Sequence, residues 1–154
     1  AAKKVAVVQS GNFSLGVNVL LGLALKAAEL LDGYDAELVE YHHNQKKDAP
    51  SGTALMLAKA VARGKGLELE KAMVCGREGQ VGARKKDEIG VLAVRGGGIV
   101  GRHDVMFVSD YETITLSHLA HSREAFSTGV MKAVRFATHA KPGHYNMLDV
   151  LGLK

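Results

Sequence analysis

Residues 36–62 read AELVEYHHNQKKDAPSGTALMLAKAVA, and this stretch decides the fold. Its first part, Ala36–Tyr41, alternates between apolar and polar residues, which is typical of a β-strand. A polar loop follows, and Thr53–Ala62 then consists mostly of helix-forming residues. Residues common at helix N-termini mark the start of this helix: Asp48, Pro50 and Ser51. The stretch therefore predicts a strand and a helix that are joined by a polar loop.

The segments on either side complete the predicted order of elements. Upstream, Lys3–Gln9 predicts a strand, and Ser14–Leu31 predicts a helix that Ser14 or Asn12 could cap. Apolar residues recur along this helix at helical spacing: Leu15, Val19, Leu23, Ala27 and Leu31. Downstream, the patterns predict strands at residues 72–75, 88–95, 105–109 and 111–119, a helix at 122–140, and a tail at 144–154 with a small apolar cluster.

Strands grouped after two helices predict an α+β fold, with a mixed β-sheet and helices packed on one face. The other face of such a sheet would stay open to solvent. A partner subunit is a plausible cover, so we expect oligomerisation to bury this face. The length of 154 residues suits a single domain that spans residues 1–154.

Composition narrows the class of protein. The net charge of +4 is too weak and too scattered to favour nucleic acid as a partner, and tryptophan is absent. The one cysteine, Cys75, cannot form an internal disulfide, so a cytoplasmic location is expected. We expect Cys75 to be a small buried residue rather than a catalytic thiol. The longest apolar stretch, Val17–Leu31, contains charged residues and predicts a packed helix rather than a membrane span.

The polar loop carries the residues with the most chemistry. His42 and His43 titrate near neutral pH, and Lys46 and Lys47 add positive charge beside them. Ser51-Gly52-Thr53 opens a helix, where free amides and the helix dipole attract an anion. This grouping suits a carboxylate or phosphate held beside a proton donor, but it also suits a polar loop before an ordinary helix start. No metal is expected, since no third ligand stands at a standard spacing.

Two further segments have an uncertain role. Gly96–Gly101 (GGGIVG) fits the dinucleotide pattern G-x-G-x-x-G, but a strand is predicted after it where that fingerprint requires a helix. We therefore predict a glycine-rich hairpin connection. The segment Ser10-Gly11-Asn12-Phe13 lies between a strand and a helix, where it could contact a ligand or simply form a capping turn.

Residues 40–55, EYHHNQKKDAPSGTAL, resemble the signature E-x-H-H-x-x-K-x-D-A-P-S-G-T-A of the dihydrodipicolinate reductase (4-hydroxy-tetrahydrodipicolinate reductase) family. The resemblance extends nearly end to end, including residues 10–18, 77–82, 89–103, 118–123 and 145–151. It points to the C-terminal substrate-binding and tetramerisation domain of that family. One departure is Gly98, which stands where the family usually carries an acidic residue.

The resemblance implies an NADPH- or NADH-dependent oxidoreductase that reduces a cyclic dicarboxylate in the diaminopimelate route to lysine. His42 would be the general acid that protonates the substrate, and Lys46 the second catalytic residue. The substrate-binding residues would be His43, Gly52 and Thr53, and those near the nicotinamide would be Ser10, Gly11, Asn12 and Phe13. A homotetramer is also implied.

Family members begin with a Rossmann cofactor domain, and that half is expected to be absent from this chain. The isolated chain is therefore predicted to be largely inactive, and residues 141–154 are predicted to pack on the absent domain. Two alternatives stay open: a non-catalytic anion-binding domain and a purely oligomerising domain.

Overall fold

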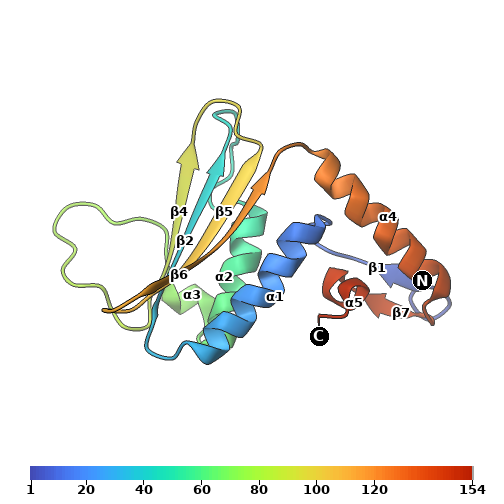
Figure 1. Cartoon of the computed structure of the whole chain (residues 1–154), viewed down its shortest axis with the longest axis horizontal. Helices are drawn as coiled ribbons and strands as arrows, with labels where there is room; N and C mark the ends of the chain where they lie inside the picture. Colours follow the sequence, from blue (N-terminus) through green and yellow to red (C-terminus); the bar gives the residue numbers. More distant parts are fainter. Residues whose placement is uncertain (154) are drawn as a thin grey trace.

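The computed structural model describes residues 1–153 (Figure 1). The helices are α1 (Leu15–Leu30), α2 (Gly52–Gly64), α3 (Leu69–Ala72), α4 (Glu124–His139) and α5 (Met147–Leu151). The strands are β1 (Ala6–Val8), β2 (Asp35–His42), β3 (Met73–Val74), β4 (Ile89–Arg95), β5 (Gly101–Val108), β6 (Thr113–Ala120) and β7 (Gly143–Tyr145).

The larger sheet within these residues has the strand order β3-β4-β2-β5-β6. The pairs β3–β4 and β4–β2 are parallel, whereas β2–β5 and β5–β6 are antiparallel. Helices α1 and α2 lie together against one face of this sheet (Figure 1). The predicted α+β class, with a mixed sheet and helices on one face, is therefore confirmed.

The main core lies between the two helices and the face of the sheet that they cover, here called the inner face. Strand β2 alternates between buried and partly exposed residues, so Leu38 faces the core together with Val91 and Val105 of the neighbouring strands. Leu57 of α2 packs into the same cluster and is fully buried. Burying one such side chain contributes about 1.5–3 kcal/mol, so this cluster holds α2 on the sheet.

Helix α1 begins as predicted, since the Ser14 side chain accepts a hydrogen bond from the Val17 amide at 3.3 Å. The stripe that it buries is different from the one that its spacing suggested. Val19 and Leu23 are exposed, and the buried apolar residues are Val17, Leu20, Leu21, Ala24 and Ala28. Because α1 is apolar on several sides, its pattern does not specify which side meets the sheet.

A smaller unit forms beside the main sheet. Strands β1 and β7 pair in parallel, and α4 and α5 pack near them (Figure 1). Its buried cluster consists of Ala133, Met147 and Val150, with Phe13 and Phe136 packed against it. Neither β7 nor α5 was predicted, because the tail showed only a short apolar cluster. Helix α4 leaves apolar side chains exposed on its other side, among them Val130, Met131 and Val134.

Two further sequence predictions are wrong. Gly96–Gly101 is not a hairpin connection, because β4 and β5 lie on opposite sides of β2 and do not pair. The segment instead crosses the end of β2, where the Gly96 amide donates to the His42 carbonyl oxygen at 2.9 Å. Cys75 is exposed rather than buried, because it follows the two-residue edge strand β3 and enters a surface loop. Among residues 1–153, no helix has the length and apolar character to cross a membrane.

Candidate active site

The site is built on a row of polar residues that crosses the inner face of the sheet. Glu40 of β2 pairs with His103 of β5, and His103 pairs with His118 of β6. Directly paired residues point to the same face, so these three side chains lie side by side beneath the helices. His42 lies two residues beyond Glu40 on the same strand face and pairs with Arg95 of β4.

Glu40 is the centre of this group, with only 1% of its surface exposed. Its Oε1 atom accepts hydrogen bonds from Arg95 Nη2 at 2.7 Å and from the Ser51 amide at 3.3 Å. Its Oε2 atom contacts Nδ1 of His42. Burial alone would raise the pKa of the Glu40 carboxyl, but the hydrogen bonds from Arg95 and His42 outweigh it and lower that pKa. Glu40 is therefore a buried carboxylate.

His42 lies at the edge of the core, in T-shaped contact with His103 at a distance of 5.3 Å between ring centroids. Burial lowers the pKa of His42, and the charges of Lys46 and Arg95 lower it further. The hydrogen bond and charge of Glu40 act in the opposite direction and recover part of this shift. A neutral imidazole with these neighbours can take up a proton when an anion binds close by.

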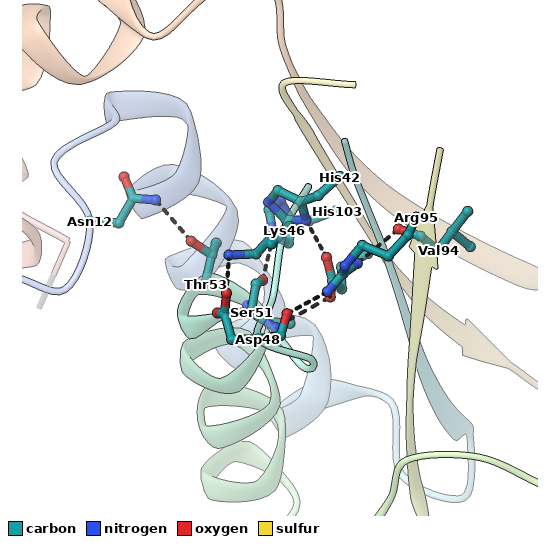
Figure 2. Close-up of polar contacts among 11 residues, drawn as sticks. Asn12, His42, Lys46, Asp48, Ser51, Thr53, Val94, Arg95 and His103 are labelled. Atoms are coloured by element: carbon teal, nitrogen blue, oxygen red, sulfur yellow. Dashed lines mark hydrogen bonds and ion pairs between the residues drawn. The ribbon is translucent and has the colours of Figure 1, made fainter. Parts of the chain in front are cut away.

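A small cavity of about 40 Å³ opens beside His42 at the N-terminus of α2. Side chains of Asn12 and Thr53 close it on one side, where Asn12 Nδ2 donates to Thr53 Oγ1 at 2.9 Å (Figure 2). Further lining residues include Gly101, His103, His118 and Phe126. The cavity thus brings together the turn before α1, the end of β2 and the start of α2.

The start of α2 offers donors to this region. Ser51 caps the helix, and its side chain accepts from the Ala54 amide at 3.2 Å. The amides of Gly52 and Thr53 have no acceptor within residues 1–153. A Cβ atom added to Gly52 would meet nothing within 4 Å, so the backbone there is open to a ligand. Free amides at the positive end of a helix dipole can bind a carboxylate.

The two other histidines at the cavity have low proton affinity. His103 is 5% exposed, and burial together with the nearby His42 lowers its pKa to about 4. Burial also lowers the pKa of His118. The Nδ1 atoms of both are buried and have no hydrogen-bond partner within the described part of the chain. Buried polar nitrogens normally have partners, so these two favour a polar group in or near the cavity.

The remaining predicted residues do not line this cavity. Lys46 donates from Nζ to Asp48 Oδ1 at 2.8 Å within the loop, and it is drawn beside His42 in Figure 2. His43 is partly buried at the start of the same loop. Ser10 and Gly11 line a different hollow of about 350 Å³, between α1, α2 and α5. Phe13 packs against the smaller core cluster rather than at the cavity.

Glu40, His42 and His103 also form a group whose ligand atoms all lie within 4.8 Å of one another. Arg95 and the Ser51 amide bind Oε1 of Glu40, and Oε2 contacts Nδ1 of His42, so a cation between Oε2 and His42 would have to replace the hydrogen on that nitrogen. The sequence did not indicate this group, because His103 comes from a distant strand. That no metal is bound stays a prediction.

Four residues of the site were missed as participants: Glu40, Arg95, His103 and His118. Glu40 could have been recognised from the sequence. It continues the alternation of β2 by which Ala36 and Leu38 face the core. A charged residue at such a position needs a buried partner. The partner itself, Arg95, lies 55 residues away, and nothing in the local pattern pairs the two.

The comparisons with known proteins agree with this architecture. Residues 16–151 match the family described as dihydrodipicolinate reductase, C-terminus. The 4-hydroxy-tetrahydrodipicolinate reductase of Roseobacter denitrificans is 54% identical over 149 residues, which cover 96% of this chain and 55% of that protein. The protein of the same name from Campylobacter hominis is 51% identical over 152 residues, which cover 99% of this chain and 59% of that protein.

A solved structure has the same fold. Dipicolinate-bound dihydrodipicolinate reductase from Paenisporosarcina sp. TG-14 aligns with a TM-score of 0.72 and 24% identity, over 92% of this chain and 53% of that one. The chain thus spans a little over half the length of the curated relatives it matches. With a family match over residues 16–151, the chain belongs to the dihydrodipicolinate reductase C-terminal family.

Proposed function

We propose that this chain is the substrate-binding domain of a 4-hydroxy-tetrahydrodipicolinate reductase of the diaminopimelate route to lysine, and that it supplies that enzyme's catalytic residues. The observation that carries the proposal is the cavity at which His42, Asn12 and Thr53 meet beside the free amides of α2. The chemistry of this arrangement suits a cyclic dicarboxylate, because the free amides at one end can bind an anion and His42 at the other end can donate a proton.

In this proposal the Gly52 and Thr53 amides hold one carboxylate of the substrate, with His43 beside it. Lys46 turns from Asp48 toward the substrate and places its positive charge near a developing negative one. His42 then donates the proton. The pKa of His42 is lowered in the unliganded site, and the anionic substrate raises it again. Substrate binding itself therefore promotes the protonation of His42.

The reduced nicotinamide, NADPH or NADH, supplies a hydride when it is bound. The fit of this chain to such a cofactor is partial. Gly96–Gly101 leads into strand β5, so it lacks the helix N-terminus that a dinucleotide pyrophosphate requires. Ser10 and Gly11 line a hollow of about 350 Å³, which suits one end of the cofactor. We assign residues 10–13 to the nicotinamide end alone.

The proposal has consequences for assembly and location. We propose that the exposed apolar side of α4 and the segment after it, residues 141–154, pack on the cofactor-binding portion of the enzyme. A hollow of about 890 Å³ along α4, lined by residues such as Met131 and Phe136, supports this placement. A homotetramer in the cytoplasm belongs to the same proposal.

The first test is titration of pyridine-2,6-dicarboxylate (dipicolinate), a flat dianion, by calorimetry. We expect the chain to bind it, and the double variant His42→Ala, Lys46→Ala to bind at least about tenfold more weakly, since each lost charged hydrogen bond is worth about 1.5–3 kcal/mol. Lys47→Ala is the matched control, because it removes the same charge from an exposed position of the same loop. If Lys47→Ala weakens dipicolinate binding equally, the effect of the double variant comes from the net charge and not from the site.

The second test measures reduction itself. A chimera would carry this chain in place of the matching 149 residues of the Roseobacter denitrificans relative. We expect the chimera to oxidise NADPH when 4-hydroxy-tetrahydrodipicolinate is supplied. His42→Asn in the chimera should lower kcat by about 10²–10⁴-fold. A chimera that folds and binds dipicolinate but does not turn over would favour a non-catalytic anion-binding domain.

A further inference from the structure

We infer that Glu40 is the positioning residue of His42: it holds the imidazole with its proton on Nδ1 and leaves Nε2 as the atom that exchanges a proton at the cavity. This inference rests on the proposed role of His42 in the reaction. It adds a residue and a tautomer to that role, and both can be tested without turnover.

The contacts of Glu40 leave it little freedom. One carboxylate oxygen is held by Arg95 and by the Ser51 amide, and the other contacts His42. A carboxylate this deeply buried is stable only when its oxygens are satisfied, so the side chain cannot rotate without losing bonds to charged partners. Arg95 also donates to the Asp48 carbonyl oxygen at 2.7 Å (Figure 2). The loop between β2 and α2 is therefore held by the same guanidinium that binds Glu40.

The tautomer follows from the donor and acceptor inventory. An ionised carboxylate only accepts hydrogen bonds, so the ring nitrogen that faces it must carry the hydrogen. In neutral His42 the hydrogen therefore lies on Nδ1, and Nε2 is bare. Gly101 faces this nitrogen, and a Cβ atom there would lie 3.2 Å from Nε2. The missing side chain at Gly101 thus leaves Nε2 open to the cavity.

Three other charged or titratable groups lie around His42: Lys46 from the loop, Arg95 from β4 and His103 from β5. The positive charges of Lys46 and Arg95 oppose protonation of His42, and Glu40 is the negative group that favours it. Removing the Glu40 charge should therefore lower the pKa of His42 further.

The test uses ¹⁵N-labelled chain and long-range ¹H–¹⁵N correlation spectra, in which protonated and bare ring nitrogens have different shifts. The His42 signals are assigned by their loss in His42→Asn. At a pH where the ring is neutral, we expect hydrogen on Nδ1. In Glu40→Gln the amide oxygen stays on Arg95, so its NH₂ group faces Nδ1, and we expect the hydrogen to move to Nε2. The pKa of His42 should fall by about one unit.

Glu37→Gln is the matched control. Glu37 lies on the same strand but on the opposite face, and it too is held by two ion pairs, with Arg77 and Arg84. We expect this control to leave the His42 tautomer unchanged. Gly101→Ala should also keep the tautomer but weaken dipicolinate binding, because its methyl group occupies the space before Nε2.

Hydrogen on Nε2 of neutral His42 in the parent chain would overturn the inference, and this result does not depend on the folding of Glu40→Gln. An unchanged tautomer in a folded Glu40→Gln chain would overturn it as well. The proposed function fails separately: the tautomer could switch as expected while His42→Asn in the chimera keeps full reductase activity. That outcome would keep the positioning of His42 and remove its catalytic role.

Discussion

At the scale of single residues, His103 links the site to the stability of the fold. Its imidazole is buried between His42 and Ser51, whose Oγ lies 3.3 Å from Nε2. Burial lowers the pKa of His103 to about 4, so the folded protein keeps it neutral across the range in which an unfolded histidine becomes charged. Protonation at acidic pH is therefore coupled to unfolding.

The sign of this coupling gives a prediction. Below the unfolded pKa of about 6.5 the unfolded chain binds the proton and the folded chain does not, so stability should fall as the pH drops from about 6.5 to about 4. The contribution of His103 is about 3 kcal/mol over that window. Urea unfolding followed by circular dichroism at several pH values measures it. His103→Gln should flatten the dependence, whereas the exposed His121→Gln should leave it as in the parent chain.

At the scale of elements, the residue that caps α2 makes two separate hydrogen bonds. Ser51 stabilises the helix start through the Ala54 amide, and its own amide holds Glu40. The free amides that we assign to the substrate follow directly after it. The position of the helix and the position of the carboxylate site are therefore set by the same residue.

Ser51→Ala should lower the free energy of unfolding by about 1 kcal/mol, since one helix cap is lost. It should also weaken dipicolinate binding, because the first turn of α2 frays at the anion site. Asn146→Ala is the control, since it removes the side-chain cap of α5 instead. Denaturation measures the free energy of unfolding of both variants, and calorimetry measures their affinity for dipicolinate. Equal affinity of Ser51→Ala and the parent chain would contradict the role of this helix start in binding.

The loop of residues 75–88 shows how charges hold an irregular segment on the sheet. Arg84 contacts Asp35 and Glu37 of β2, and it also donates to the carbonyl oxygens of Ala36 and Glu88. Burial would raise the pKa of Glu37, but the hydrogen bonds of Arg77 and Arg84 outweigh it and lower that pKa. The loop is thus anchored where it has little apolar surface to bury.

Arg84→Gln should destabilise the fold by about 2 kcal/mol, because several hydrogen bonds of a charged donor are lost and Glu37 keeps one guanidinium instead of two. The same variant should be cleaved faster within residues 75–88 in limited proteolysis. Lys85→Gln removes an adjacent exposed charge and should change neither quantity. Equal protease resistance in the Arg84 and Lys85 variants would show that the loop is held by other contacts.

At the scale of the whole molecule, the outer face of the larger sheet, which α1 and α2 do not cover, bears exposed apolar side chains beside charged ones. Register places Tyr41 beside Val94 and also beside Arg102, which in turn pairs with Leu119. Val94 is 40% exposed and Leu119 is 51% exposed. Exposed apolar side chains on an uncovered sheet face favour burial against further copies of the chain.

We expect sedimentation equilibrium to give four times the mass of one chain, in line with the proposed homotetramer. Leu119→Glu should shift the distribution to smaller species while the circular dichroism spectrum stays the same, because a charge would be buried in the interface without a partner. Leu30→Glu is the control, since Leu30 is 69% exposed at the end of α1. A parent chain that sediments as a monomer would contradict the assembly proposal.

The sequence by itself determined the order along the chain of the main strands and helices, the starts of α1 and α2, and the loop of candidate residues. These features depend on interactions between neighbours in the chain: period-two alternation, helical spacing and capping hydrogen bonds. It also carried the signature by which the family could be named. The short elements β7 and α5 were missed because they lie in a tail with too few residues to show a period.

Only the tertiary structure decided what surrounds His42. The strand order β4-β2-β5 places Arg95 and His103 on either side of Glu40, and the register sets which face they share. Shifting one strand by a single residue would turn its core-facing side chains to the outer face. The alternation within β2 places Glu40 on the inner face, but it does not specify which residues of the neighbouring strands lie beside it. The buried stripe of α1 and the crossing of Gly96–Gly101 over β2 were decided in the same way, by packing between segments far apart in the chain.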